Sequence, residues 1–216
     1  MPLDFIEIIV VAVAGFLAGA VNSVAGGGTF FSFPALLAVG VPPVIANASN
    51  AVALWPGSLA GAWAFRRELR RFAVSLPALS AIAFVGGIAG GLLLLRTSNE
   101  RFSMLVPWLL LLATLLFAFS GPLSSGIRSL LRRARQQHER ALENERSHER
   151  AAPMRQFGPG GYLFQGVVSI YGGFFGAGMG ILMIASLAIQ GFDDLHEINA
   201  LKNWLSAVIY SVAVAT

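Results

Sequence analysis

The stretch NSVAGGGTFFSFPALLAVGVPPVIANASN, residues 22–50, contains a glycine triplet, a proline pair and three asparagines, and it has no charged residue. Each glycine lowers helix stability by up to ~1 kcal/mol relative to alanine, so we expect Gly26, Gly27 and Gly28 to interrupt a helix. The apolar residues 5–22 precede the triplet, and the apolar segment 29–39 that follows it is too short to span a bilayer alone. The stretch therefore predicts one long broken membrane helix, or a spanning helix followed by a re-entrant arm.

The rest of the chain has the composition of a membrane protein. Of its 216 residues, 56% are hydrophobic and 12% are charged, whereas soluble domains have about 25% charged residues. No charged residue occurs between Ile8 and Phe65, a run far longer than the ~20 residues that cross a bilayer. Further apolar segments occupy residues 43–65, 72–95 and 102–120. We expect an all-α polytopic protein that crosses the lipid bilayer of the cytoplasmic membrane several times.

The arginines predict which loops face the cytoplasm. Four of them lie within residues 66–71, and eight lie within residues 128–155. Both clusters flank apolar spans and lack interleaved aromatic residues, so they indicate membrane topology rather than nucleic-acid binding. The positive-inside rule then places both clusters in the cytoplasm and Pro42 on the outer side. The side of the N-terminus stays open, because it depends on whether residues 5–40 cross the membrane once.

The glycine-rich segment occurs twice. Residues 15–40, GFLAGAVNSVAGGGTFFSFPALLAVG, resemble residues 166–191, GVVSIYGGFFGAGMGILMIASLAIQG, in length and in their central and terminal glycines. An asparagine motif follows each block, NASN at 47–50 and NALKN at 199–203, with spacings that place each pair on one helical face. We therefore predict a first transmembrane repeat over 1–127, an arginine-rich cytoplasmic loop over 128–157 and a second transmembrane repeat over 158–216. The second repeat lacks counterparts of 72–95 and 102–120, so we expect it to be truncated.

Duplicated membrane segments that are interrupted by glycine at matching positions indicate a transport site near the midplane. Glycine-lined backbone and helix N-termini bind anions, because no side chain blocks the N–H groups. Neutral donors nearby are Asn22, Ser23, Thr29, Asn47, Asn50, Asn199 and Asn203. Lys202, the sole lysine, lies within an apolar span, where an ionisable group indicates a functional site.

Each of these features also has a purely structural interpretation. The glycines could serve only close helix packing, as we expect for Gly57 and Gly61. Asn47 and Asn203 could join helices without touching substrate. Lys202 could extend to the membrane surface or pair with a carboxylate such as Asp194.

Enzymatic and nucleotide-binding interpretations lack the necessary residues. The chain has no cysteine, and neither glycine-rich segment is followed by the GK[ST] of a phosphate loop. In the cluster DDLHE, capping of a helix by Asp193 or Asp194 accounts for the acidic residues, and His196 or Glu197 is an alternative proton relay. We expect no catalytic residues, no metal and no cofactor.

Two segments resemble the signatures of the sulfite exporter TauE/SafE family of membrane transporters. They are AGGGTFFSFPALLAVGVPPVIANASNAVALWPGSLAGAWAFRREL, residues 25–69, and GGFFGAGMGILMIASLAIQGFDDLHEINALKNWLSAVI, residues 172–209. The resemblance implies two related halves and transport of sulfite, sulfonates or other small sulfur-containing or organic anions. Carried onto this chain, it implies a substrate-binding role for Gly26, Gly27, Gly28, Asn47, Asn50, Gly176, Gly178, Asn199, Lys202 and Asn203. The alternative is a membrane scaffold or assembly subunit that has this fold without transport, and a homodimer would compensate for missing helices.

Overall fold

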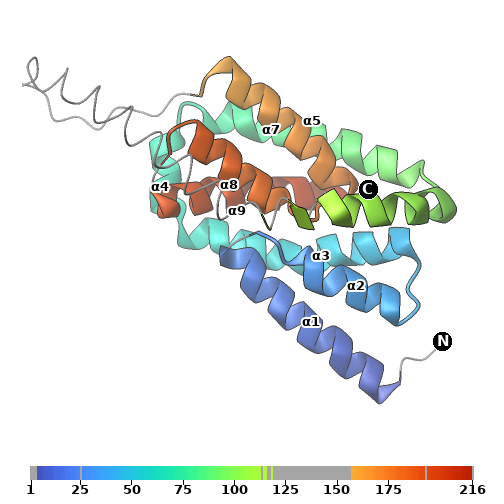
Figure 1. Cartoon of the computed structure of the whole chain (residues 1–216). Coiled ribbons are helices and arrows are strands. Elements are labelled where there is room, and N and C mark those ends of the chain that lie inside the picture. Colours follow the sequence, from blue (N-terminus) through green and yellow to red (C-terminus); the bar gives the residue numbers. More distant parts are fainter. Residues whose placement is uncertain are drawn as a thin grey trace, which may run out of the picture.

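The computed structural model describes residues 4–24, 26–112, 114–115, 118, 157–192 and 194–215. Within these ranges the regular elements are all helical, as the composition predicts (Figure 1). Residues 99–112 are also helical, and the arginine-rich segment 128–155 lies outside the described residues. The elements in chain order are α1 (Phe5–Val24), α2 (Thr29–Ala38), α3 (Pro43–Ala64), α4 (Arg66–Leu69), η1 (Arg70–Phe72), α5 (Leu76–Leu95), α7 (Pro159–Phe174), α8 (Met179–Ile189) and α9 (Leu195–Ala215).

The glycine triplet ends α1 and allows the chain to turn back. Gly26 has φ +78°, which is a left-handed conformation that glycine adopts without steric cost. Its N–H donates to the carbonyl oxygen of Val21 at 3.2 Å, five residues earlier. Gly176 repeats this geometry at the end of α7, with φ +78° and a 3.2 Å bond to Tyr171. Gly26 and Gly176 are 150 residues apart, whereas the repeated sequence blocks 15–40 and 166–191 are offset by 151 residues. The two halves therefore break at equivalent positions.

The short helices α2 and α8 also end in the same way. Gly40 and Gly191 have φ +79° and +86°, and the following residue in each case bonds back to a carbonyl five residues earlier, at 3.0 Å. This is the Schellman motif, in which a left-handed glycine satisfies the last carbonyls of a helix. The predicted internal repeat is thus confirmed in the backbone: α1, α2 and α3 correspond to α7, α8 and α9.

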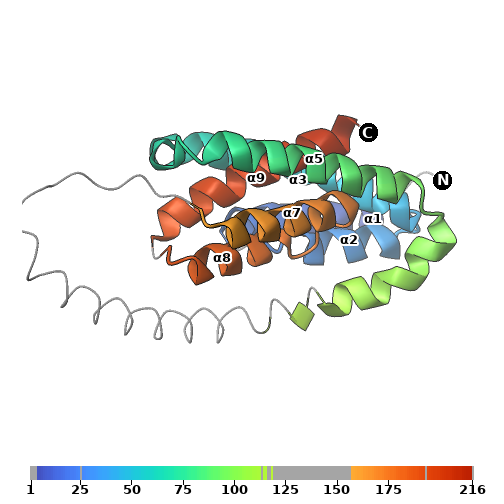
Figure 2. The ribbon, with the colours of Figure 1, turned by 90° about the horizontal axis from the view of Figure 1, so that it is seen from above.

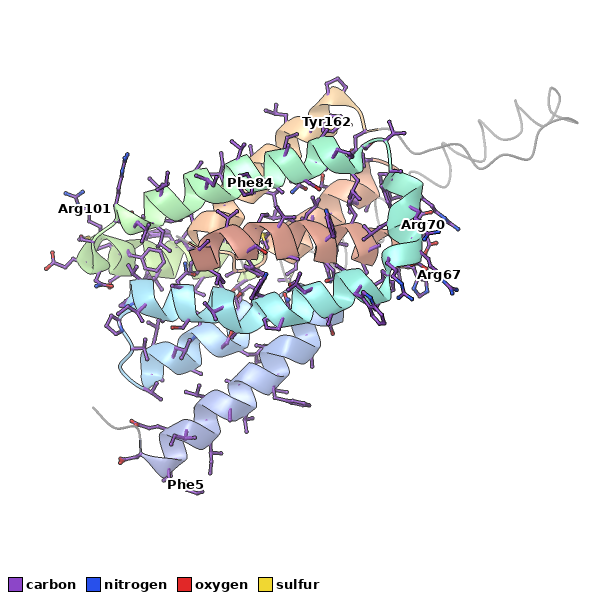
Figure 3. All side chains as sticks on the ribbon, turned by 180° about the vertical axis from the view of Figure 1, so that it is seen from behind. Phe5, Arg67, Arg70, Phe84, Arg101 and Tyr162 are labelled. Carbon is purple, nitrogen blue, oxygen red and sulfur yellow. The ribbon has the colours of Figure 1, made fainter. Side chains whose placement is uncertain are left out.

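The two halves point in opposite directions. In Figures 1 and 2, α1 runs from one end of the bundle toward the other and α2 returns to the end where α1 began. The hairpin of α7 and α8 starts and finishes at the opposite end. Figure 3 places Arg67, Arg70 and Tyr162 at one end of the bundle, and Arg101 and Phe5 at the other. Residues 5–40 therefore form a hairpin with both ends at one end of the bundle. The sequence leaves open whether this segment crosses once, and the structure shows a hairpin instead.

The halves share one interior. Helix α5 packs against α7 and α9, and α3 packs against α9. Leu54, Leu79, Val168, Leu201 and Ile209 are buried together in this interior, so the two halves are joined by apolar contacts. The outer surface is apolar as well, with Phe84 exposed on α5 (Figure 3). Among the described residues, three helices are long and apolar enough to cross a membrane: Phe5–Ser23, Leu76–Leu95 and Leu195–Ala215.

Candidate functional site

The glycine break after α1 touches the first turn of α8, directly after the break in the second half. A Cβ atom placed on Gly26 would lie 2.5 Å from the Cα of Gly180, and a Cβ on Gly180 would lie 2.5 Å from the Cα of Gly26. Gly28 is equally confined, since its Cβ would lie 2.2 Å from the carbonyl oxygen of Ala18. Any side chain at these positions would force the backbones apart. The break is therefore a backbone-to-backbone junction between the two halves, which we call the break junction.

Helix α3 fixes the start of α2 within the first half. The amide Nδ2 of Asn50 donates to Oγ1 of Thr29 at 2.9 Å, and Oδ1 of Asn50 accepts a hydrogen bond from the hydroxyl of Ser32. All three side chains are buried. The sequence predicts Asn50 and Thr29 as site residues but misses Ser32, although a serine in the apolar segment FFSF could have indicated it.

Each half also supports the end of the broken helix in the other half. Asn47 on α3 donates from Nδ2 to the carbonyl oxygen of Phe174, the last residue of α7, at 2.9 Å. Lys202 on α9 donates from Nζ to the carbonyl oxygens of Asn22 and Ser23, near the end of α1, at 3.2 Å each. The last carbonyls of a helix lack intrahelical partners and carry its negative dipole end, so an amide or ammonium donor stabilises them. These bonds form a reciprocal clamp across the break junction.

A small cavity of about 70 Å³ adjoins this clamp. It lies between α3, α5, α7 and α9, and it includes Asn47 and Asn50 on one face of α3, as their spacing predicts. Asn47 is 5% exposed, and its Oδ1 has no hydrogen-bond partner among the described residues. The remaining lining residues are Val44, Ala48, Ala51, Gly91, Leu94, Leu95, Gly172, Gly173, Phe175, Tyr210 and Ala213. Tyr210 was not predicted, since a single tyrosine in an apolar helix has no distinguishing sequence signal.

The other predicted residues lie outside this cavity. Asn22 is buried beside Gly28 and takes part in the clamp through its backbone carbonyl. Asn203 is buried. A Cβ atom placed on Gly61 would lie 2.5 Å from Nδ2 of Asn203. Asn199 is half-buried, and its Oδ1 has no described partner. Gly61 is therefore closely packed, as predicted, and its neighbour is a polar side chain from the other half. The same prediction for Gly57 is wrong, because a Cβ there would meet nothing within 4 Å.

The remaining predicted glycines are all buried. Gly27 and Gly28 lie between α1 and α2, and Gly28 immediately precedes α2. Gly176 and Gly178 lie between α7 and α8, where Gly178 has φ +73° and immediately precedes α8. Neither α2 nor α8 has a side-chain hydrogen bond at its N-cap.

The ionisable residues near the start of α9 have structural partners. Oδ1 of Asp194 accepts from the backbone N–H of His196 at 2.8 Å, as a capping residue does. The guanidinium of Arg71 donates to Glu197 at 2.5 Å and lies 3.9 Å from Asp194. This hydrogen bond to Glu197 raises the pKa of Arg71, so the guanidinium stays charged. Lys202 is turned away from Asp194 toward α1, so neither the predicted carboxylate pair nor extension to the surface is observed.

Inverted halves that meet at broken helices define a class of polytopic membrane proteins built from internal repeats. The family described as sulfite exporter TauE/SafE matches residues 11–216, and the chain belongs to this family.

Curated relatives are named in the same terms. A "Probable membrane transporter protein" of Haemophilus influenzae is 29% identical over 183 residues, which cover 83% of this chain and 62% of the relative. The "Probable membrane transporter protein YfcA" of Escherichia coli K12 is 29% identical over 182 residues, covering 82% of this chain and 58% of the relative. The chain thus spans about three-fifths of the length of these relatives. No solved structure matches.

Proposed function

We propose that the protein is a secondary carrier or facilitator for a small anion in the cytoplasmic membrane, with sulfite, sulfonate or a related sulfur-containing or organic anion as substrate. The observation that carries this proposal is the break junction, where both glycine breaks meet under a reciprocal clamp. Backbone that leaves its helix within a membrane is tolerated where it is buried in protein or lines a cavity. Transporters with inverted repeats bind substrate at such places.

The chemistry of the junction favours an anion. Neither α2 nor α8 has a side-chain N-cap, and the positive ends of both helix dipoles lie at the junction, which favours a negative charge there. Several of the first N–H groups, such as those of Phe31 and Ile181, donate to backbone carbonyls of the preceding glycines, so an oxyanion would have to share or replace these bonds. Lys202 brings a basic side chain into the buried interior, whereas the buried carboxylate of Glu197 is paired with Arg71. The family description names sulfite, a small oxyanion whose oxygens suit several backbone and amide donors at once.

Transport would proceed by opening of the two hairpins in turn. Because the halves are inverted, a movement that opens one hairpin toward its own side has an equivalent in the other hairpin on the opposite side. Asn47, Asn50 and Lys202 each join a helix to a neighbouring break. These side chains would therefore couple the opening of one hairpin to the closing of the other. The chain lacks a nucleotide-phosphate loop, so a gradient of ions or protons would drive any uphill step.

Efflux of labelled sulfite from proteoliposomes tests the proposal. Asn50→Ala removes the bonds to Thr29 and Ser32, and we expect about tenfold slower flux, which corresponds to ~1.4 kcal/mol. Ser49→Ala is the matched control, since Ser49 is on the same helix but exposed. Sulfite flux equal to that of empty vesicles, with folded protein, would contradict the proposal and favour the non-transporting scaffold.

A further inference from the structure

The two glycine breaks release equivalent backbone carbonyls at the ends of α1 and α7. At each break the glycine N–H donates to a carbonyl five residues earlier. The next two carbonyls along each helix therefore receive no hydrogen bond from a backbone N–H of the described residues. These carbonyls belong to Asn22 and Ser23 in α1, and to Gly172 and Gly173 in α7.

In the first half the ammonium group of a side chain binds the released carbonyls. Nζ of Lys202 donates to the carbonyl oxygens of Asn22 and Ser23 at 3.2 Å each. The C-terminal end of a helix is the negative end of its dipole, so a positive charge is stabilised there. The first half thus receives its cation from α9 of the other half.

In the second half the released carbonyls belong to residues that line the cavity beside Asn47. Gly172 and Gly173 are both lining residues, and no described side chain donates a hydrogen bond to either. Asn47 is 5% exposed, and its Nδ2 donates to the carbonyl oxygen of Phe174 at 2.9 Å, which determines the orientation of the amide. Oδ1 of Asn47 therefore remains an acceptor, and it has no partner among the described residues. The cavity brings together three oxygen acceptors at the negative end of α7.

These acceptors suit a small monovalent metal cation. Carbonyl oxygens are ligands for hard cations, and a volume of about 70 Å³ admits such an ion together with water. None of the described residues that line the cavity is charged, so a divalent cation would lack the carboxylates that usually bind it. An oxyanion is disfavoured here, because it would face acceptors and the negative end of a helix dipole. The anion of the proposed transport instead belongs at the starts of α2 and α8.

We propose that this cavity binds a monovalent metal cation, such as Na⁺, at the position equivalent to that of the Lys202 ammonium in the first half. Its ligands are Oδ1 of Asn47 and the carbonyl oxygens of Gly172 and Gly173, with water completing the coordination. In transporters built from inverted repeats, the C-terminal ends of broken helices bind the coupling cation. This coupling role rests on the proposed function, whereas binding of the cation does not. The ion is cargo, which distinguishes it from the resident metal that the sequence argues against.

Binding of radioactive Na⁺ to the purified protein, measured by scintillation proximity without sulfite and at constant ionic strength, tests the proposal. We expect saturable binding that is displaced by unlabelled Na⁺ but not by choline, a cation too large to be coordinated by these oxygens. Absence of saturable binding, or equal displacement by choline, overturns the proposal. Displacement by Ca²⁺ at lower concentration than by Na⁺ overturns the assignment to a monovalent cation.

Two variants of Asn47 separate a ligand from a merely structural residue. Asn47→Leu and Asn47→Asp both lose the hydrogen bond to Phe174, but only Asn47→Asp keeps an oxygen at the cavity. We expect Asn47→Leu to weaken Na⁺ binding at least about tenfold, since even an outer partner of a metal ligand contributes that much. Asn47→Asp should retain Na⁺ binding, as should Ser49→Ala, the exposed control on the same helix.

Thermal unfolding gives a second readout for the same variants. The carboxylate of Asn47→Asp lies at the negative end of α7, so we expect Na⁺ to raise its unfolding temperature more than choline does. Equal loss of Na⁺ binding in both Asn47 variants, with folded protein, would mean that Asn47 only supports α7, and it would overturn the site. Neither readout involves sulfite, so failure of this proposal and failure of the transporter proposal are distinguishable.

Discussion

Gly26 and Gly40 have nearly the same backbone conformation but different surroundings. Their φ values are +78° and +79°, so alanine at either position incurs the cost of a left-handed conformation, about 1–2 kcal/mol. At Gly40 the added Cβ meets nothing within 4 Å, whereas at Gly26 it would lie 2.5 Å from the Cα of Gly180. We expect Gly26→Ala to lower the free energy of unfolding by about 1–3 kcal/mol more than Gly40→Ala, because the break junction becomes overpacked.

This difference can be measured by unfolding both variants with SDS in mixed micelles. Because the two alanines share the strain of the left-handed backbone, the difference between them reports on contact between the halves. Equal destabilisation would mean that the breaks do not touch, and that Gly26 serves only the turn after α1.

At the scale of elements, the reciprocal clamp joins the helices of one half to the broken helix of the other. Lys202→Met leaves two carbonyl acceptors of α1 without this donor, and loss of a partner for buried polar groups costs about 1–3 kcal/mol. Asn47→Leu removes one amide bond to Phe174, and hydrogen bonds between membrane helices average ~0.6 kcal/mol with a maximum of ~1.7. We therefore expect both variants to be less stable, with Lys202→Met the more affected.

The free energy of unfolding of each variant, compared with Ser49→Ala, gives these effects. Lys202→Met with unchanged stability would contradict a supporting role for the ammonium at the end of α1. Such a result, together with slower sulfite flux, would instead favour direct contact between Lys202 and substrate.

The elements were easier to predict from the sequence than their contacts. Glycine at 26–28 and at 176 and 178 predicts where the helices break, because backbone freedom is a local property. The partners of Lys202 and Asn47 could not be predicted, since each bonds to a backbone carbonyl more than 120 residues away that any residue type could supply. The roles of Gly180 and Gly61 likewise depend on which residue of the other half faces them.

For the whole molecule, the direction of the hairpins determines on which side of the membrane the N-terminus lies. Asp4 and Ser98 are exposed, with Asp4 just before α1 and Ser98 in the turn after α5. The start of α1 lies at the Arg101 end of the bundle, opposite Arg67 and Arg70 (Figure 3). By the positive-inside rule we expect the end of the bundle that carries Arg67 and Arg70 to face the cytoplasm. We therefore expect the N-terminus to lie outside the cytoplasm.

Single cysteines test this orientation in intact cells, without background from native thiols. A membrane-impermeant maleimide should label Asp4→Cys and Ser98→Cys directly, because both lie on the outer side. Ala73→Cys, in the exposed turn after the arginine cluster, should be labelled only after the membrane is permeabilised. Labelling of Ser98→Cys but not of Asp4→Cys in intact cells would mean that residues 5–40 cross the membrane once, and the inverted relation of the two halves would then be wrong. Because the break junction depends on two hairpins that enter from opposite sides, this result would also remove the structural basis of the proposed anion site.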